Sequence, residues 1–472
     1  MEVRKLALAR LQAGAGPEEL TELLLAHGNQ EPVAEWGCWH ARTLATKSLQ
    51  SLLELVAAGG ANAVLFVMRA HTQLVTVQTD GSACIACIAS GDDGCRKMLL
   101  AVGGVDALLG GMQAHPTSAE VATVATVALS RLAMCSADAE HAVIATHTPA
   151  AVISAMQAHP LEPELQRAGC GLLHYLAAGS GEHRRLIIEA GGVPAVVAAM
   201  RGHPTRSPIQ EDGCGVLCSL AAPCEDCEDA PQKVLGAGGG EAIIGAMLQA
   251  PRHVKVQRWG CIALCAAAAS ESRHVDVASK GAHAVVLAMR AHSSDVLVQE
   301  QASAALWSIA AGGGVGCQAV LDAGGARAIC DALRRHQGES VLARRGFRAI
   351  GALGGSSEAG LHAVHEAGGV KLIARAIRAN MGDAALLEDG FRALGELDWR
   401  SDRMRTALLA EDVIGLVVEV LAGWSACFLT LSPAFEQGKL LLAQLARQSD
   451  EHRRMAFDAG ADPVWLGTAS VR

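Results

Sequence analysis

Aromatic residues are scarce in this sequence: Phe, Trp and Tyr together make up 3% of 472 residues, and only one is Tyr. Bulky aromatic and β-branched side chains are the usual filling of a sheet, and no stretch alternates apolar and polar residues strictly enough to be a strand. Small residues are abundant instead, with 51 glycines and many alanines. This composition excludes a bulky β core and favours helices that approach one another closely.

An excess of positive charge is also missing. Lys and Arg total 39 against 48 Asp and Glu, for a net charge of −9. A protein that binds nucleic acid normally needs a basic face to neutralise phosphates, so we expect no nucleic-acid partner.

The first residues, MEVRKLALARLQAGAG, lack the apolar core of a secretory signal. Most of the 15 cysteines fall in apolar helical stretches, so we expect reduced, buried thiols. These features predict a cytoplasmic protein, with the nucleus as an alternative. A mitochondrial transit peptide is a weaker alternative, based on Arg4, Lys5 and Arg10.

One apolar stretch, Val413–Phe435, is long enough to cross a bilayer. It contains the charged Glu419, which is costly inside a membrane, and it is interrupted by Gly423 and Pro433. We therefore expect no membrane span.

What the sequence has is a repeat. Phrases such as AGGVPAVVAAMRGHP (190–204) recur, and three residue types return with a common period that is 44 residues in the first half. The first is a histidine, at His27, His71, His115, His159, His203, His292 and His336. The second is a methionine, at Met68, Met112, Met156, Met200, Met247 and Met289. The third is a glycine, at Gly37, Gly81, Gly169, Gly213, Gly260, Gly346 and Gly390. The methionines share the repeat period, so we expect them in the core.

The sequence pattern of each repeat predicts three helices. The first is short and ends at a Gly-Gly turn with a positive φ, as in His183–Gly192. The second resembles Pro194–His203 and the third Val296–Gly313. The pattern gives about ten units and a partial eleventh at 450–472. In the unit near Asp402, Glu411–Val413 replaces the glycine turn and delays the third helix to about Pro433–Arg447. The chain ends without a clear polar cap, so we expect that it is truncated or that a partner covers its end.

This pattern resembles the armadillo repeat over nearly the whole chain. Gly191–Met200 is similar to the family's second-helix phrase G-G-x-x-x-L-V-x-x-L, and Val298–Ala310 to its third-helix phrase. The phrasing is most similar to arrays in leucine-rich-repeat kinases and in uncharacterised armadillo proteins. The resemblance implies an all-α, right-handed solenoid, one domain over 1–472. It also implies a protein or extended-peptide partner in a concave groove lined by the third helices.

We therefore expect a non-catalytic interaction scaffold with no cofactor and no small-molecule substrate. No nucleophile–base–acid set can be named, and the glycine clusters at 238–240 and 312–314 lack the Lys-Ser or Lys-Thr of a phosphate loop. The alternative is a nucleocytoplasmic transport carrier similar to importin-alpha. That group binds basic signals through a Trp and Asn ladder, of which only Trp39 is present here.

Two groups of residues are candidates for partner binding. Trp36 and Trp39 are three apart on one helix and share a face, although they would equally plug the N-terminal end of the stack. Arg345, Arg348 and Arg392 would face one groove and bind an acidic or phosphorylated peptide. Against this, Asp389 and Glu396 would neutralise Arg392 within its own helix, and Arg344 beside Arg345 suggests a plain solvated basic face. We also assign Asp212 and Trp259 to the groove.

The sequence raises two hypotheses about a metal site. Histidines one helix layer apart, about 10 Å, cannot share a zinc ion whose ligands each lie about 2.0–2.1 Å from it. We expect these rings at helix C-termini, meeting the last carbonyls of their helix. A zinc or redox site formed by Cys214, Cys218, Cys224 and Cys227 is a second alternative, but Cys214 shares its column with Cys38, Cys170 and Cys261, which indicates core packing.

Overall fold

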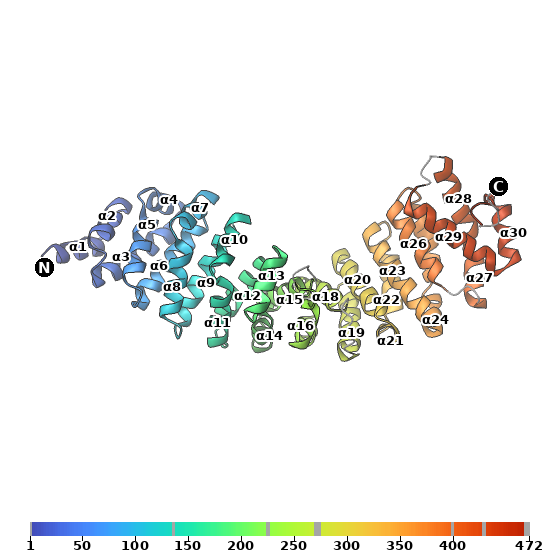
Figure 1. Ribbon diagram of the computed structural model, residues 1–472, viewed down its shortest axis with the longest axis horizontal. Helices are drawn as coiled ribbons and strands as arrows, with labels where there is room; N and C mark the ends of the chain where they lie inside the picture. Colours follow the sequence, from blue (N-terminus) through green and yellow to red (C-terminus); the bar gives the residue numbers. More distant parts are fainter. Residues whose placement is uncertain are drawn as a thin grey trace. The chain divides into compact units, whose positions relative to one another are not determined.

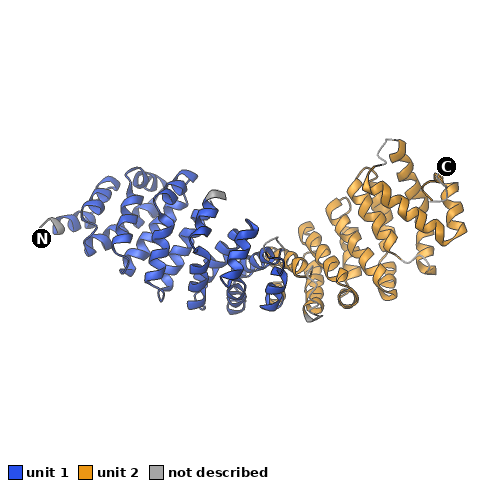
Figure 2. Cartoon of the chain, in the orientation of Figure 1, with its two compact units in different colours: residues 1–242 blue, residues 243–472 orange. Residues whose placement is uncertain are grey.

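The structure is a computed structural model of the chain and describes residues 2–134, 137–222, 227–268, 275–397, 401–426 and 431–466. Thirty helices, and no β-strand, occur in these ranges (Figure 1). The chain divides into two compact units, residues 1–242 and 243–472 (Figure 2). That residues 1–472 form a single array stays a prediction.

In unit 1 the helices follow one another as first, second and third helices of successive three-helix units. The first helices are α1 (Glu2–Gln12), α4 (Leu49–Ala57), α7 (Asp93–Ala101), α10 (Ala137–Ala145), α13 (Gly181–Glu189) and α16 (Ala230–Gly236). The second helices are α2 (Pro17–His27), α5 (Gly60–Ala70), α8 (Gly104–Ala114), α11 (Thr148–Ala158), α14 (Gly192–Gly202) and α17 (Gly239–Gln249), which contains the unit boundary. The third helices are α3 (Glu31–Lys47), α6 (Val75–Ala89), α9 (Ala119–Ala133), α12 (Pro163–Ala177) and α15 (Ser207–Leu220).

Unit 2 continues the same order. Its third helices are α18 (Val254–Ala268), α20 (Val296–Ala311), α23 (Ser340–Ser356), α26 (Ala384–Glu396) and α29 (Pro433–Gln448). Its first helices are α21 (Gly314–Asp322), α24 (Glu358–Glu366), α27 (Asp402–Ala410) and α30 (Asp450–Asp458), and its second helices are α22 (Gly325–Arg335), α25 (Gly369–Ala379) and α28 (Val413–Ala426). The single helix α19 (Val275–Ala291) takes the place of both a first and a second helix. The delayed third helix expected near Pro433 is confirmed.

Glycine turns separate first from second helices, as the sequence predicts. Gly191 has φ +83° and Gly324 φ +78°, a left-handed conformation that glycine adopts without strain. Asp412 takes this position in the deviating unit, at φ +45°. Where Lys280 stands at the corresponding position, the chain continues as the single helix α19. His147 also takes the left-handed conformation, at φ +60°, between α10 and α11, so a residue with a Cβ does not by itself prevent the turn.

The core lies between second and third helices. The six predicted methionines are all buried, with at most 6% of each exposed. Each of four packs on the glycine of the following third helix: a Cβ at Gly213 would stand 2.6 Å from the Sδ of Met200, and a Cβ at Gly81 would stand 2.7 Å from that of Met68. The glycine column is therefore the space that the methionine column fills, and the methionine prediction is confirmed.

Six histidines at the ends of second helices bind the three-helix unit before them. The Nε2–H of His71 donates to the backbone oxygen of Gly28 at 2.8 Å, and that of His203 to Pro160 at 2.9 Å. The same bond recurs at His115, His159, His292 and His336. The expectation that these rings meet the last carbonyls of their own helix is therefore wrong, because the acceptor follows the preceding second helix.

The last carbonyls of the second helices are bound by a glutamine instead. The amide of Gln210 donates to the backbone oxygens of Met200 at 2.8 Å and of His203 at 2.9 Å. The same pair of bonds recurs at Gln78, Gln166, Gln257 and Gln299. These side chains are almost completely buried. They satisfy carbonyls that a helix end leaves without an intrahelical partner.

Arginines near the ends of second helices bind the three-helix unit that follows. Arg69 donates to the backbone oxygens of Val102 and Gly103, at 2.5 and 2.9 Å. Arg334 donates in the same way to Ala367. Successive three-helix units are thus joined by hydrogen bonds from side-chain donors to backbone oxygens.

No single described helix is both long and apolar enough to cross a membrane. Together α4 and α5 pass that test, but they are bent by 74° relative to each other.

Candidate functional site: the third-helix surface

The third helices form a row in each unit. In unit 1, α3, α6, α9, α12 and α15 pack side by side in that order, and in unit 2 α18, α20, α23, α26 and α29 do so (Figure 1). Their glycine faces turn toward the second helices, so the opposite faces are available for polar and aromatic side chains. All seven candidate residues lie on these helices.

Trp36 and Trp39 form an open aromatic pair on α3. Their ring centroids are 5.3 Å apart in a T-shaped arrangement, a favourable geometry for two aromatic rings. They are 39% and 41% exposed. His40 anchors the helix beneath them, because its buried Nε2–H donates to the backbone oxygen of Ala15 at 2.7 Å. More than a third of each indole is thus accessible on a helix held in place.

Charged and polar groups join α3 to α6 beside this pair. Arg42 lies 2.8 Å from the carboxylate of Asp80, and the hydroxyl of Thr76 donates to Glu35 at 2.7 Å. Burial raises the pKa of the Asp80 carboxyl, and the charge of Arg42 opposes that rise. Because these groups are already satisfied by one another, the open part of this surface is mainly aromatic.

Asp212 lies on α15 and contacts α12. Its carboxylate is 3.3 Å from the Nδ1 of His174, and the two side chains are 29% and 20% exposed. The His174 ring occupies the space above Gly215, where an added Cβ would stand 2.4 Å from ring atoms. Trp259, on α18 of unit 2, is partly buried.

The predicted arginines of unit 2 already have acidic partners. Arg348 and Arg344, both on α23, hold the buried carboxylate of Asp389 on α26 at 2.8 and 2.9 Å. Arg345 lies 3.9 Å from Glu300, and Arg392 pairs with Glu388. The expectation that Asp389 neutralises Arg392 within its own helix is therefore wrong, because Asp389 is bound by the preceding third helix.

One tryptophan that the sequence reasoning missed completes this network. The guanidinium of Arg348 lies over the Trp307 ring, 5.5 Å from its centroid, in cation–π geometry. Trp307 lies on the third helix α20, and Arg348 lies on α23, the third helix of the next three-helix unit. The signal that would have identified Trp307 is its spacing from the glycine column, because no local motif marks it.

The cysteine column lies in the core. Cys38, Cys170, Cys214 and Cys261 are fully buried, and burial raises the pKa of the Cys38, Cys170 and Cys261 thiols. Of the four-cysteine candidate, Cys227 is buried and Cys218 is partly buried, while Cys224 lies outside the described residues. Among the described residues no group of three or more His, Cys, Asp or Glu side chains is arranged to hold a metal ion. The zinc or redox alternative stays a prediction.

No protein-family model and no curated protein matches the chain. Solved structures do match it. An engineered protein with 23% identity covers 91% of this chain and 98% of its own, with a TM-score of 0.73. A structure from work on a phosphorylation switch that controls the interaction between cadherin and beta-catenin has 15% identity and a TM-score of 0.77, covering 97% of this chain and 91% of its own. A designed armadillo repeat protein covers 53% of this chain and 99% of its own, with 19% identity and a TM-score of 0.45.

The chain has the armadillo-repeat fold. The three-helix units are therefore armadillo repeats, and α3, α6 and their counterparts are the third helices of those repeats. Likeness at these identities describes the fold, so the function of this armadillo array has to be argued from its own side chains.

Proposed function

We propose that this protein is a non-catalytic interaction scaffold that binds a protein or an extended peptide along its third-helix surface. The observation that carries the proposal is the exposed pair Trp36 and Trp39 on α3. Tryptophan is enriched at binding hot spots because a large ring buries much apolar area with few rotatable bonds. The structure from work on the interaction between cadherin and beta-catenin resembles the chain in fold, and that work concerns protein interaction.

The arginines of unit 2 would contribute a second contact, to an acidic or phosphorylated segment of the partner. Such a segment would compete with Asp389, Glu300 and Glu388, which already hold these arginines. That competition lowers the gain from each contact, since a new ion pair replaces an existing one. We therefore place the main anchor at the tryptophan pair.

Peptide selection on the purified chain tests the main anchor. Peptides of random sequence, displayed on phage and selected on the wild-type protein, would be compared for binding to the Trp39→Ala variant. Loss of a hot-spot ring costs about 2 kcal/mol or more, so we expect affinity to fall at least about 30-fold. The melting temperature should change little, because the ring is exposed.

Phe66→Ala is the matched control. Phe66 is 43% exposed, and it lies on the second helix α5, which belongs to unit 1 as α3 does. It should leave peptide affinity unchanged. If Trp39→Ala lowers the melting temperature while the affinity per folded molecule stays constant, the ring is a structural element and the proposal fails.

A further inference from the structure

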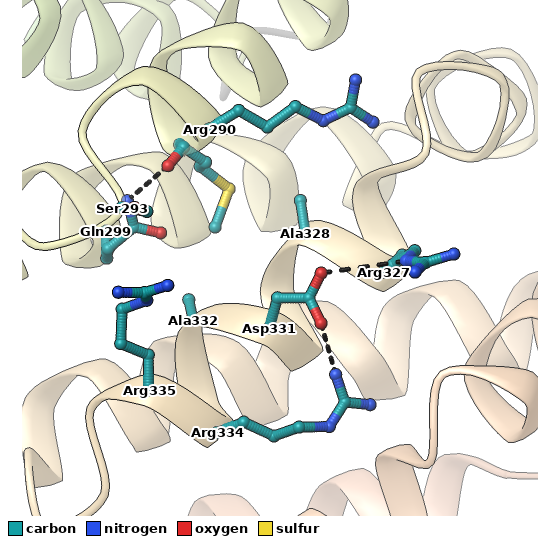
Figure 3. A pocket seen from close by; sticks show the side chains of 10 residues that line it. Arg290, Ser293, Gln299, Arg327, Ala328, Asp331, Ala332, Arg334 and Arg335 are labelled. Carbon is teal, nitrogen blue, oxygen red and sulfur yellow. Dashed lines mark hydrogen bonds and ion pairs between the residues drawn. The ribbon is translucent and has the colours of Figure 1, made fainter.

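The second helices of unit 2 border a cavity that is open to solvent and separate from the third-helix surface. It lies between the C-terminal end of α19 and the helix α22, and has a volume of about 730 Å³ (Figure 3). Small-molecule sites in proteins occupy about 300–1,000 Å³. The cavity is therefore of a size that fits a compact ligand.

Four arginines line this cavity. Arg290 comes from α19, and Arg327, Arg334 and Arg335 come from α22, where spacings of seven and eight residues place them on one face (Figure 3). The only carboxylate in the lining is Asp331, which pairs with Arg334 and lies 3.8 Å from Arg327. Four positive charges and one negative charge leave three positive charges uncompensated.

Two of these guanidiniums have no protein partner. Among the described residues, neither Arg290 nor Arg335 forms an ion pair or a hydrogen bond, whereas Arg334 is held by Asp331 and by the backbone oxygen of Ala367. Like charges gathered in one hollow repel one another. A bound anion would remove that repulsion.

The polar groups at the floor of the cavity are already satisfied. Gln299 donates to the backbone oxygens of Met289 and His292, each at 2.9 Å, and His336 donates to that of Ser293 at 2.8 Å. Carbonyl oxygens at a helix C-terminus would otherwise repel an anion. Here they accept hydrogen bonds, so the charged donors open to the cavity are the guanidiniums.

The same hollow exists in unit 1 without the charges. Between α8 and α11 a cavity of about 360 Å³ is lined by Gln113, Ala150, Ser154 and Ala158, where the unit 2 cavity has Arg290, Arg327, Asp331 and Arg335. The repeat therefore builds this hollow with neutral residues. Packing does not require the arginines.

We propose that the arginine-lined cavity between α19 and α22 binds a compact, soluble ligand that carries several phosphate groups. Arginine pairs with phosphate through two parallel hydrogen bonds. A phosphate carries up to two negative charges where a carboxylate carries one, so clustered phosphates balance three positive charges in a small volume. Membrane docking would need protruding apolar side chains, but Met289, Ala328 and Ala332 in the lining are buried.

Calorimetric titration of the full chain with inositol hexakisphosphate, used as a probe, tests the proposal. We expect one bound molecule per chain and affinity that weakens as salt is added. Arg327→Ala with Arg335→Ala should weaken binding at least about tenfold, because each removes a charge-assisted hydrogen-bond donor. Arg327→Lys with Arg335→Lys keeps the charge and loses the paired donors, so it should also bind more weakly than the wild type.

A charge-matched control is Lys97→Ala with Arg206→Ala, which removes two exposed cations from unit 1 and should leave binding unchanged. Asp331→Asn should strengthen binding, because it removes the competing carboxylate, and a misfolded variant cannot mimic a gain. Equal binding by the double alanine variant and the wild type would overturn the proposal. Binding only to vesicles that contain a phosphoinositide, and not to the free probe, would overturn the assignment of a soluble ligand.

Discussion

Gln210 is the residue whose replacement best tests the hydrogen-bond scheme at the ends of the second helices. Its side chain is 2% exposed, and its amide donates to the backbone oxygens of Met200 and His203. In an uninterrupted helix the Met200 oxygen would accept from residue 204, but that residue is Pro204, which has no N–H. The His203 oxygen has a second donor, the N–H of Arg206 at 3.1 Å.

Gln210→Met keeps the length of the side chain and removes both donors. The Met200 oxygen then loses the glutamine donor, and an unsatisfied buried acceptor costs about 1–3 kcal/mol. The second bond is lost from an oxygen that keeps the Arg206 N–H, at a net cost of about 1 kcal/mol. Together we expect a loss of about 2–4 kcal/mol in the local stability of α14 and α15.

Native-state hydrogen exchange measures this loss where it occurs. A repeat array can open locally, so protection in one repeat reports its own free energy of opening. The expected loss lowers protection of the α14 and α15 amides by a factor of about 30 to 700. Gln50→Met is the control, since Gln50 is exposed and its change should cost less than about 0.5 kcal/mol. Unchanged protection at α14 and α15 would refute the reasoning.

Two further predictions concern glycine and a helix cap. Gly213→Ala should lower the stability of unit 1, measured by chemical denaturation, by about 1–2 kcal/mol, because the new methyl group would stand 2.6 Å from the Met200 side chain. Gly110→Ala should raise stability by about 1 kcal/mol in the same assay, because a Cβ at Gly110 would have no atom within 4 Å. Asp383→Ala removes the N-cap of α26 and should cost about 1 kcal/mol at neutral pH. Hydrogen bonds from the Ser340 hydroxyl and the Leu386 N–H lower the pKa of the Asp383 carboxyl. Its contribution is therefore complete above the unfolded pKa of about 3.9 and is lost as pH falls through the lower folded pKa. A stability difference between wild type and Asp383→Ala that persists at strongly acidic pH would contradict this assignment.

The order of helices follows from the sequence because it depends on local chemistry. Three features of the fold follow from the repeat spacing in the sequence. They are the positive φ at Gly191, the methionine packed on Gly213 and the delayed start of the third helix at Pro433. The fusion of two helices into α19 was not predicted, because Asp412 keeps the turn at the position where Lys280 continues the helix.

The polar contacts were harder to predict because their partners lie one repeat away. The spacing of His203 shows that it recurs, but its acceptor, Pro160, becomes its neighbour only when the layers stack. Asp389 illustrates the same difficulty, since its own helix offers Arg392 and the preceding third helix offers Arg344 and Arg348. Which arginine reaches the buried carboxylate depends on the offset between two helices, and that offset is not written in either helix alone.

The bonds between layers have a consequence for how such a chain can change its length. His71 and Arg69 both end on backbone oxygens, those of Gly28 on one side and of Val102 and Gly103 on the other. Every residue supplies a backbone oxygen, so neither donor depends on which side chain the neighbouring repeat carries. A duplicated segment of 44 residues brings its own donors and finds acceptors already present on both sides. Gene duplication or deletion of whole repeats would thus leave each new junction with these hydrogen bonds, without a compensating substitution elsewhere.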